Sequence, residues 1–307
     1  RAHRNLGIHL IYRGDYLSAR KHYRLGAELA RQAGDTVGQI YSLSALTTNL
    51  MASGDFEKAR RILSGMRALL STLTEPSSAA EMVYSDEMAY TAFLGEWVEA
   101  ARLARARLAS SRERGDDVNL PSAGWWLARV VLESRTLGDG APAGKWEEAE
   151  TALAEAIEIL DCSSIPPDMA VRSRVYLGRL RLTQGRLDDA QRLLVEAREK
   201  ASVQPLTVEE ASLQVLAAQI AAAEGRWGEA LAALEAVAGI QASEGRRWYW
   251  ARRLLDWAEA HVSRDEPGDR DRARELLRDA QVAFEEMGIP RYAAVAKDRL
   301  EALEAAP

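Results

Sequence analysis

Residues 177–194 read LGRLRLTQGRLDDAQRLL, and this stretch contains the pattern that decides the fold. Leu177 and Gly178 stand eight and seven residues before Gly185, and Ala190 follows that glycine. A glycine at such a position ends a helix in the left-handed conformation, where a Cβ atom would clash. The stretch therefore predicts two helices joined by a tight turn at Gly185.

The same turn recurs along the chain as a glycine, one residue, usually an aromatic, two more residues and then an alanine. The turn glycines are Gly14, Gly54, Gly95, Gly144, Gly185, Gly225 and Gly268, at spacings of 40, 41, 49, 41, 40 and 43 residues. Each alanine and the residue four positions later fall on one helix stripe. A single hairpin cannot bury such a stripe alone, so neighbouring hairpins must stack. We predict an all-α protein, an open right-handed superhelix of about seven helical hairpins followed by a C-terminal helix.

The spacing also predicts the organisation of the chain. One superhelical domain is expected over 1–307, with hairpins over approximately 1–35, 36–77, 78–117, 121–163, 168–204, 207–242 and 246–288, and a terminal helix over 290–305. The widest interval contains an insertion over 138–144, whose three glycines and one proline predict an exposed loop. Because Arg1 already lies in a helical pattern, we expect a fragment of a larger cytoplasmic protein.

Composition excludes several classes of function. The 307 residues carry a net charge of −6, with 47% hydrophobic and 28% charged residues, which is typical of a folded globular chain. The acidic balance argues against a nucleic-acid surface, and no apolar run is long enough to cross a membrane. The single cysteine, Cys162, allows neither an intramolecular disulfide nor a cysteine-rich zinc site.

No catalytic or metal-binding motif is present. The segment from Gly138 to Lys145 approaches a phosphate-binding loop, but Asp139 replaces its first glycine and Trp146 its final hydroxyl residue. The four histidines have no zinc-site spacing, and no nucleophile elbow occurs. The adjacent Asp188-Asp189 pair is interpreted as negative charge at a helix N-terminus. We expect no catalytic residues, no metal, no cofactor and no enzyme activity.

The repeated turn resembles the tetratricopeptide repeat. That family places Leu-Gly or two small residues before the turn glycine, as in Leu6-Gly7, Leu177-Gly178 and Ala217-Ala218. The family repeat is about 34 residues long. The longer period here is similar to that of MalT-type regulators and of arrays in bacterial signal-transduction ATPases and LuxR-type activators. The resemblance implies a sensor or scaffold role beside an ATPase or DNA-binding domain of the same chain.

The resemblance also implies that the first helix of each hairpin lines a concave groove. The candidate groove residues are Tyr41, Thr48, Ser85, Trp125, Arg129, Arg172, Arg179 and Gln219. We expect the three arginines to face one cavity and to grip a carboxylate or phosphate, with Trp125 stacking beside them. The alternative is that these arginines pair with acidic side chains of the next repeat. The aromatic clusters at 125–126 and 248–250 favour packing between repeats, with an exposed partner surface as the alternative.

The resulting hypothesis is a non-catalytic scaffold module of a bacterial transcriptional or signalling regulator. Its groove would bind a protein or peptide, or an anionic small effector, with no direct contact to nucleic acid or membrane. The alternative is a passive protein–protein adaptor with no small ligand.

Overall fold

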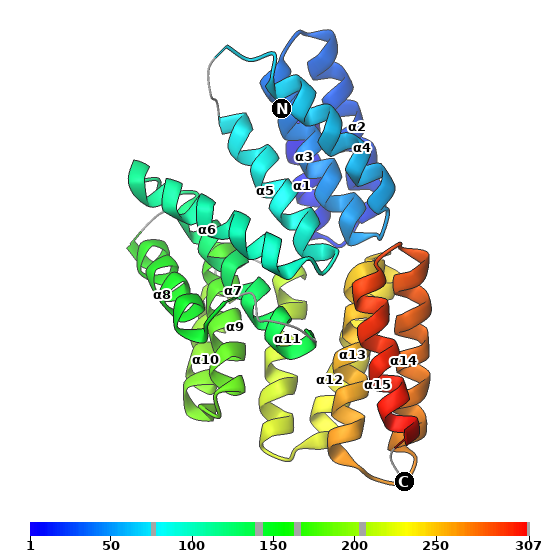
Figure 1. Ribbon diagram of the computed structural model, residues 1–307. Helices are drawn as coiled ribbons and strands as arrows, with labels where there is room; N and C mark the ends of the chain where they lie inside the picture. Colours follow the sequence, from blue (N-terminus) through cyan, green and yellow to red (C-terminus); the bar gives the residue numbers. More distant parts are fainter. Residues whose placement is uncertain (75–77, 139–143, 163–166, 203–206, 306–307) are drawn as a thin grey trace.

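The computed structural model describes residues 1–74, 78–138, 144–162, 167–202 and 207–305, and in these ranges it consists of fifteen α-helices and no strand. The helices are α1 (Ala2–Tyr12), α2 (Tyr16–Gln32), α3 (Thr36–Ala52), α4 (Phe56–Leu70), α5 (Ser78–Phe93), α6 (Trp97–Arg114), α7 (Leu120–Leu137), α8 (Trp146–Cys162), α9 (Pro167–Thr183), α10 (Leu187–Ser202), α11 (Thr207–Ala223), α12 (Trp227–Ser243), α13 (Arg247–Arg264), α14 (Asp269–Glu286) and α15 (Pro290–Ala305). Consecutive helices form antiparallel hairpins (Figure 1).

Most of the turns have the conformation that the glycine pattern predicts. The glycines at 14, 54, 95, 185, 225 and 268 all have positive φ, between 73° and 90°. The fourth turn differs, because α7 ends at Gly138 in an extended conformation and Gly144 is not among the positive-φ glycines. Residues 139–143 of the expected insertion loop lie outside the described ranges.

The repeated alanine explains how closely the hairpins pack. All seven alanines have an exposed fraction of 0%: Ala19, Ala59, Ala100, Ala149, Ala190, Ala230 and Ala273. The residue four positions after each one is also buried. A methyl group is the largest side chain that such a close approach of two helices accepts without overpacking. The prediction of an all-α superhelix of seven hairpins with a C-terminal helix is confirmed.

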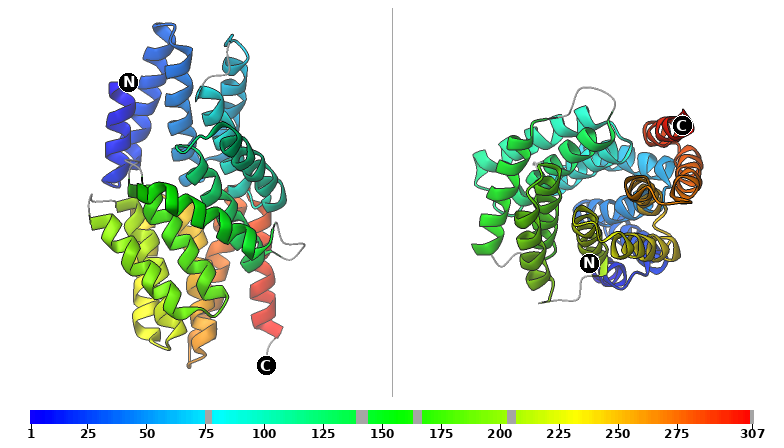
Figure 2. Two further views of the ribbon diagram at one scale, coloured as in Figure 1. Left: turned by 90° about the vertical axis from the view of Figure 1, so that its left-hand side faces the viewer. Right: turned by 90° about the horizontal axis from the view of Figure 1, so that it is seen from below.

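The superhelix differs from the expected open form because its two ends meet. The turns of the first hairpins lie end-on against the last hairpins, so that α1–α4 stand above α12–α15 (Figures 1 and 2). Trp248 Nε1 of α13 donates a hydrogen bond to the carbonyl oxygen of Phe93, at 3.0 Å. A Cβ at Gly95 would lie 2.8 Å from Cγ of Arg291, and one at Gly54 would collide with Met287. We call this contact between the two ends the seam.

None of the described helices combines the length and apolar character that a membrane-spanning segment requires.

Candidate functional site

The inner side of the superhelix contains two larger hollows and, between them, a small one of about 50 Å³ whose lining includes Arg129, Arg179 and Arg252. The first, which we call the N-terminal chamber, has a volume of about 380 Å³ and is lined by residues of α1–α3, α5, α7, α9, α11 and α13, with Arg246 at the start of α13. The second, the C-terminal groove, has a volume of about 350 Å³ and lies between α7, α9, α11, α12 and α13. The odd-numbered helices thus supply most of the lining, with additions from α2 and α12, and the resemblance to tetratricopeptide repeats implies an inward face for the odd-numbered ones.

The candidate groove residues are divided between these hollows. The N-terminal chamber is lined by Thr48, Ser85, Trp125, Arg129 and Arg172. The C-terminal groove is lined by Arg179 and Gln219. Tyr41 lines neither, because its hydroxyl donates to Ser78 Oγ at 2.6 Å and Arg4 covers its ring. The three arginines therefore do not share one large cavity, because side chains of α13 narrow the middle of the interior, where Arg129 and Arg179 both line the small hollow.

A buried ionic network forms the partition between the two hollows. Arg252 Nε donates to Glu133 Oε2 at 2.9 Å, and its second nitrogen donates to Asp256 Oδ1 at 2.6 Å. Arg253 also pairs with Asp256. Burial opposes the charge of Glu133 and of Asp256, yet the adjacent arginines hold the pKa of both carboxyl groups below the ordinary value. Both acids are therefore ionised at neutral pH; Arg252 and Arg253 pair with them directly, and Arg179 acts on both coulombically.

Arg172 of the N-terminal chamber also has an acidic partner. Its guanidinium donates to Glu209 Oε1 from two nitrogens, at 2.8 and 2.7 Å, and Asp168 lies 3.9 Å away. Glu209 belongs to α11, the first helix of the next hairpin. Arg172 thus pairs with an acidic residue of the neighbouring repeat, which is what the alternative interpretation expects.

Arg129 is the exception in the N-terminal chamber. Only 4% of the side chain is exposed, yet it forms no hydrogen bond or ion pair with any residue in the described ranges. Its guanidinium lies instead against aromatic rings, 4.8 Å from the centre of Phe93 and 4.9 Å from that of Trp126. Burial opposes its charge, but the coulombic influence of Tyr176, Tyr249 and Glu133 leaves the pKa of Arg129 above its ordinary value. The chamber thus contains a cation that no carboxylate of the described ranges contacts, and Glu133, which acts on it coulombically, is paired with Arg252.

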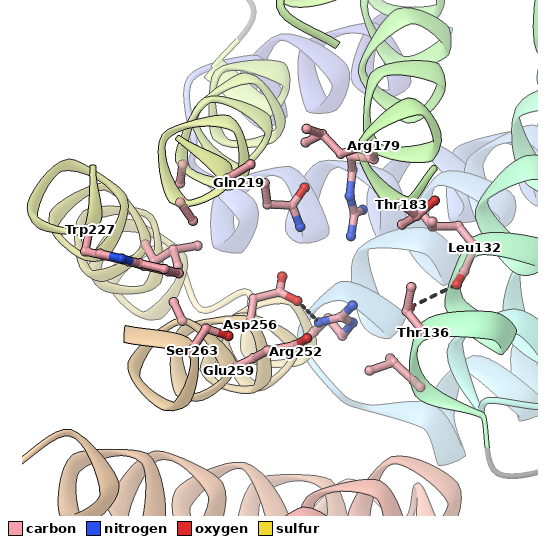
Figure 3. Close-up of a pocket in the computed structure, with 17 residues that line it drawn as sticks. Leu132, Thr136, Arg179, Thr183, Gln219, Trp227, Arg252, Asp256, Glu259 and Ser263 are labelled. Atoms are coloured by element: carbon pink, nitrogen blue, oxygen red, sulfur yellow. Dashed lines mark hydrogen bonds and ion pairs between the residues drawn. The ribbon is translucent and has the colours of Figure 1, made fainter. Parts of the chain in front are cut away.

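Arg179 is the corresponding exception in the C-terminal groove. It extends from α9 toward the space between Gln219 and the partition residues Arg252 and Asp256 (Figure 3). Its guanidinium carbon lies 5.2 Å from the centre of the Tyr176 ring, and its Nε has no hydrogen-bond partner in the structure described. The side-chain oxygen of Gln219 is likewise buried without a partner. A donor and an acceptor are therefore available side by side on one wall of the groove.

The N-terminal chamber also contains a carboxyl group that sequence analysis did not identify. Asp86 of α5 is buried, and burial raises its pKa to about 8 despite the nearby Ser44 hydroxyl and Arg107. Its Oδ2 has no hydrogen-bond partner among the described residues. At pH 7 Asp86 is therefore mostly neutral and does not offset the charge of Arg129.

No constellation in the described residues supports catalysis. Asp269 accepts a hydrogen bond from Arg264 and lies 2.6 Å from His261 Nδ1, so this buried histidine has a partner within the fold. Cys162 is exposed. The described residues contain no group of three metal-ligating side chains.

Sequence reasoning missed the partition because its residues come from helices that are far apart in the chain. One local signal was available. Arg252, Arg253 and Asp256 follow directly after the aromatic run at 248–250, and three charged residues beside such a run predict buried ion pairs rather than a solvated face.

Comparison with known proteins agrees with the geometry. No family model matches the sequence, and no curated protein matches it. The Rap protein complexed with Competence and Sporulation Factor is 14% identical with a TM-score of 0.57, over 87% of this chain and 75% of that chain. BtubC (BKLC) from P. vanneervenii is 18% identical with a TM-score of 0.53, over 73% and 90% of the two chains. A signal transduction ATPase with numerous domains from Pyrococcus horikoshii, whose sensor is a tetratricopeptide repeat, is 14% identical with a TM-score of 0.50.

The fold is that of a tetratricopeptide-repeat protein. The match to the Pyrococcus horikoshii ATPase covers 99% of this chain but 44% of that protein, so this chain spans less than half of its length. Identities this low establish the fold of this chain and nothing about its ligand.

Proposed function

We propose that the chain is a non-catalytic binding module whose C-terminal groove holds the acidic end of a peptide or protein partner. The observation that carries the proposal is Arg179, a guanidinium with an unsatisfied Nε in a groove with an otherwise largely apolar lining. Leu132, Leu182 and Trp227 supply the apolar surface for a side chain. A carboxylate on Arg179 would form a charge-assisted hydrogen bond, and Gln219 would accept one from the partner's main chain.

The proposed mechanism is a shift in population between closed and open forms of the superhelix. The C-terminal groove has walls from α7, α9 and α11 on one side and from α13 on the other. A ligand that touches both walls binds the closed form more tightly, and so it favours that form. At a concentration a hundred times its Kd, such a ligand stabilises the closed form by about 2.7 kcal/mol.

The proposed context is a bacterial transcriptional or signalling regulator of the cytoplasm, of the long-repeat MalT-like kind. An ATPase or DNA-binding domain of the same chain would respond to the change. Support comes from the ATPase that carries a tetratricopeptide repeat sensor and from the Rap protein that was crystallised with Competence and Sporulation Factor. The alternative remains a passive adaptor without a small ligand.

The melting temperature tests the proposal. We would measure it with acetyl-Ala-Leu-Leu as the free acid, with the same peptide as its amide, and with a panel of acidic peptides. A rise with the acids that is absent with the amide and is abolished by Arg179→Ala supports the proposal. Absence of a shift with every acid, together with binding to a folded protein partner only, supports the adaptor.

A further inference from the structure

The partition and the small hollow beside it lie between the N-terminal chamber and the C-terminal groove, and the proposed function does not use the chamber. It has the size of a small-molecule site, since such pockets span about 300–1,000 Å³. Thr48 is exposed and lines it, so the chamber is open to solvent there. Its other lining side chains come from helices on both sides of the seam, including Tyr249 of α13.

The charges of the chamber specify an anion with a single negative charge. Three arginines line it, and two of them already have carboxylate partners: Arg172 pairs with Glu209, and Arg246 pairs with Glu244 at 3.3 Å. Arg129 has none in the described part of the chain. One unmatched cation accommodates one negative charge, whereas a second charge on a buried ligand would have no counterion.

The lining specifies a planar apolar body beside that charge. The rings of Trp125, Tyr176 and Tyr249 line the chamber, and Trp125 and Tyr176 meet edge to face at 5.5 Å. Aromatic rings prefer such an arrangement with one another, and they bury a large apolar area. Trp125 Nε1 is buried and has no acceptor among the described residues, so a carboxylate that reached it would gain a further donor.

Asp86 completes the donor set. Its neutral form has an O–H that can donate to an anion, and its Oδ2 has no partner among the described residues. An ionised aspartate in this position would repel the same ligand. The chamber thus combines three polar groups, the Arg129 cation, the Trp125 indole N–H and the neutral Asp86 carboxyl group, with a lining of aromatic rings.

We propose that the N-terminal chamber binds a small aromatic monocarboxylate, with its carboxylate on Arg129 and its ring among Trp125, Tyr176 and Tyr249. This site is distinct from the peptide site around Arg179. It would make the chain responsive to a small acid and to a peptide independently.

The test measures binding of phenylacetate to the full chain by calorimetry and by tryptophan fluorescence. The neutral phenylacetamide and inorganic phosphate serve as comparison ligands. We expect both to bind at least tenfold more weakly than phenylacetate, because the first lacks the charge and the second lacks the ring. Equal binding of the amide or of phosphate, or no binding of phenylacetate at millimolar concentration, overturns the proposal.

Two arginine variants separate this site from the peptide site. Arg129→Gln removes the unmatched cation and should weaken phenylacetate binding about tenfold to a hundredfold. Arg179→Gln is the matched control, because Arg179 does not line the chamber and phenylacetate binding should stay unchanged. Unchanged binding in a folded Arg129→Gln variant contradicts the proposal. Failure of the acidic peptide alone would overturn the proposed function and leave this inference standing.

If Arg129→Gln does not fold, a third variant tests whether phenylacetate binds in the N-terminal chamber. Ala45 lines the chamber from α3 and is half-buried, so Ala45→Phe fills the hollow without changing any charge. We expect this variant to keep its helical circular dichroism and to lose phenylacetate binding. Retention of wild-type affinity by Ala45→Phe would show that phenylacetate binds elsewhere.

Discussion

The buried Asp86 predicts that stability falls as pH rises, and Asp86→Asn should remove that dependence. The pKa of Asp86 is about 8 in the folded chain, against an ordinary value of 3.8. Between these values the folded chain holds one proton that the unfolded chain has released. Stability is therefore fully present below the ordinary pKa and falls by about 1.4 kcal/mol per pH unit as pH rises through this window. It stops falling once Asp86 ionises in the folded state.

The expected size of the effect follows from the same slope. From pH 5 to pH 7 the wild type should lose about 3 kcal/mol relative to Asp86→Asn, which cannot ionise. Urea titrations at several pH values between 5 and 8 measure the difference, with Asp188→Asn as an exposed control that should follow the wild type. The charged neighbours Arg107 and Glu87 are present in every variant. Parallel curves for wild type and Asp86→Asn would refute the assignment of a neutral, buried Asp86.

Three further substitutions test the seam and the partition. Gly95→Ala should destabilise the chain more than Gly185→Ala. Each substitution places a Cβ at positive φ, which costs about 1–2 kcal/mol, but only the Cβ at position 95 also meets a side chain across the seam. Urea unfolding of the two variants measures the difference, and equal losses of stability would contradict the contact. Arg252→Met alone should cost about 3–5 kcal/mol, because Glu133 would remain buried with its partner removed, and adding Glu133→Leu should restore much of that loss; a double-mutant cycle without coupling would contradict the pair. Trp248→Phe should cost about 1–3 kcal/mol and speed hydrogen exchange at the end of α5, since a buried carbonyl there loses its donor; exchange that stays at the wild-type rate would count against the bond.

The hairpins themselves could be predicted from the sequence because their determinants are local. A turn glycine, an alanine five residues later and a buried residue four further on lie within one turn-helix unit, so their spacing can be read without knowledge of the rest. Residues Gly54 and Ala59 illustrate this: the turn has positive φ and the alanine is fully buried. The inward-facing helices, by contrast, were expected from the resemblance to tetratricopeptide repeats.

The closure of the superhelix could not be predicted, because it depends on small rotations that add up over many repeats. Phe93 and Trp248 are 155 residues apart, and nothing in their local sequence indicates that they meet. The surroundings of Arg129, unlike those of Arg172, depended on that closure. Arg172 meets an acid of the next hairpin, whereas Arg129 meets rings that include one from the last hairpin.

The central claim is that the interior holds two arginines whose charge is left for a ligand. The most direct measurement is a crystal structure after a soak in sodium bromide, with anomalous scattering used to locate the anion. We predict bromide peaks beside Arg129 in the N-terminal chamber and beside Arg179 in the C-terminal groove. Peaks confined to exposed arginines and helix N-termini, with both interior sites empty, would contradict the claim.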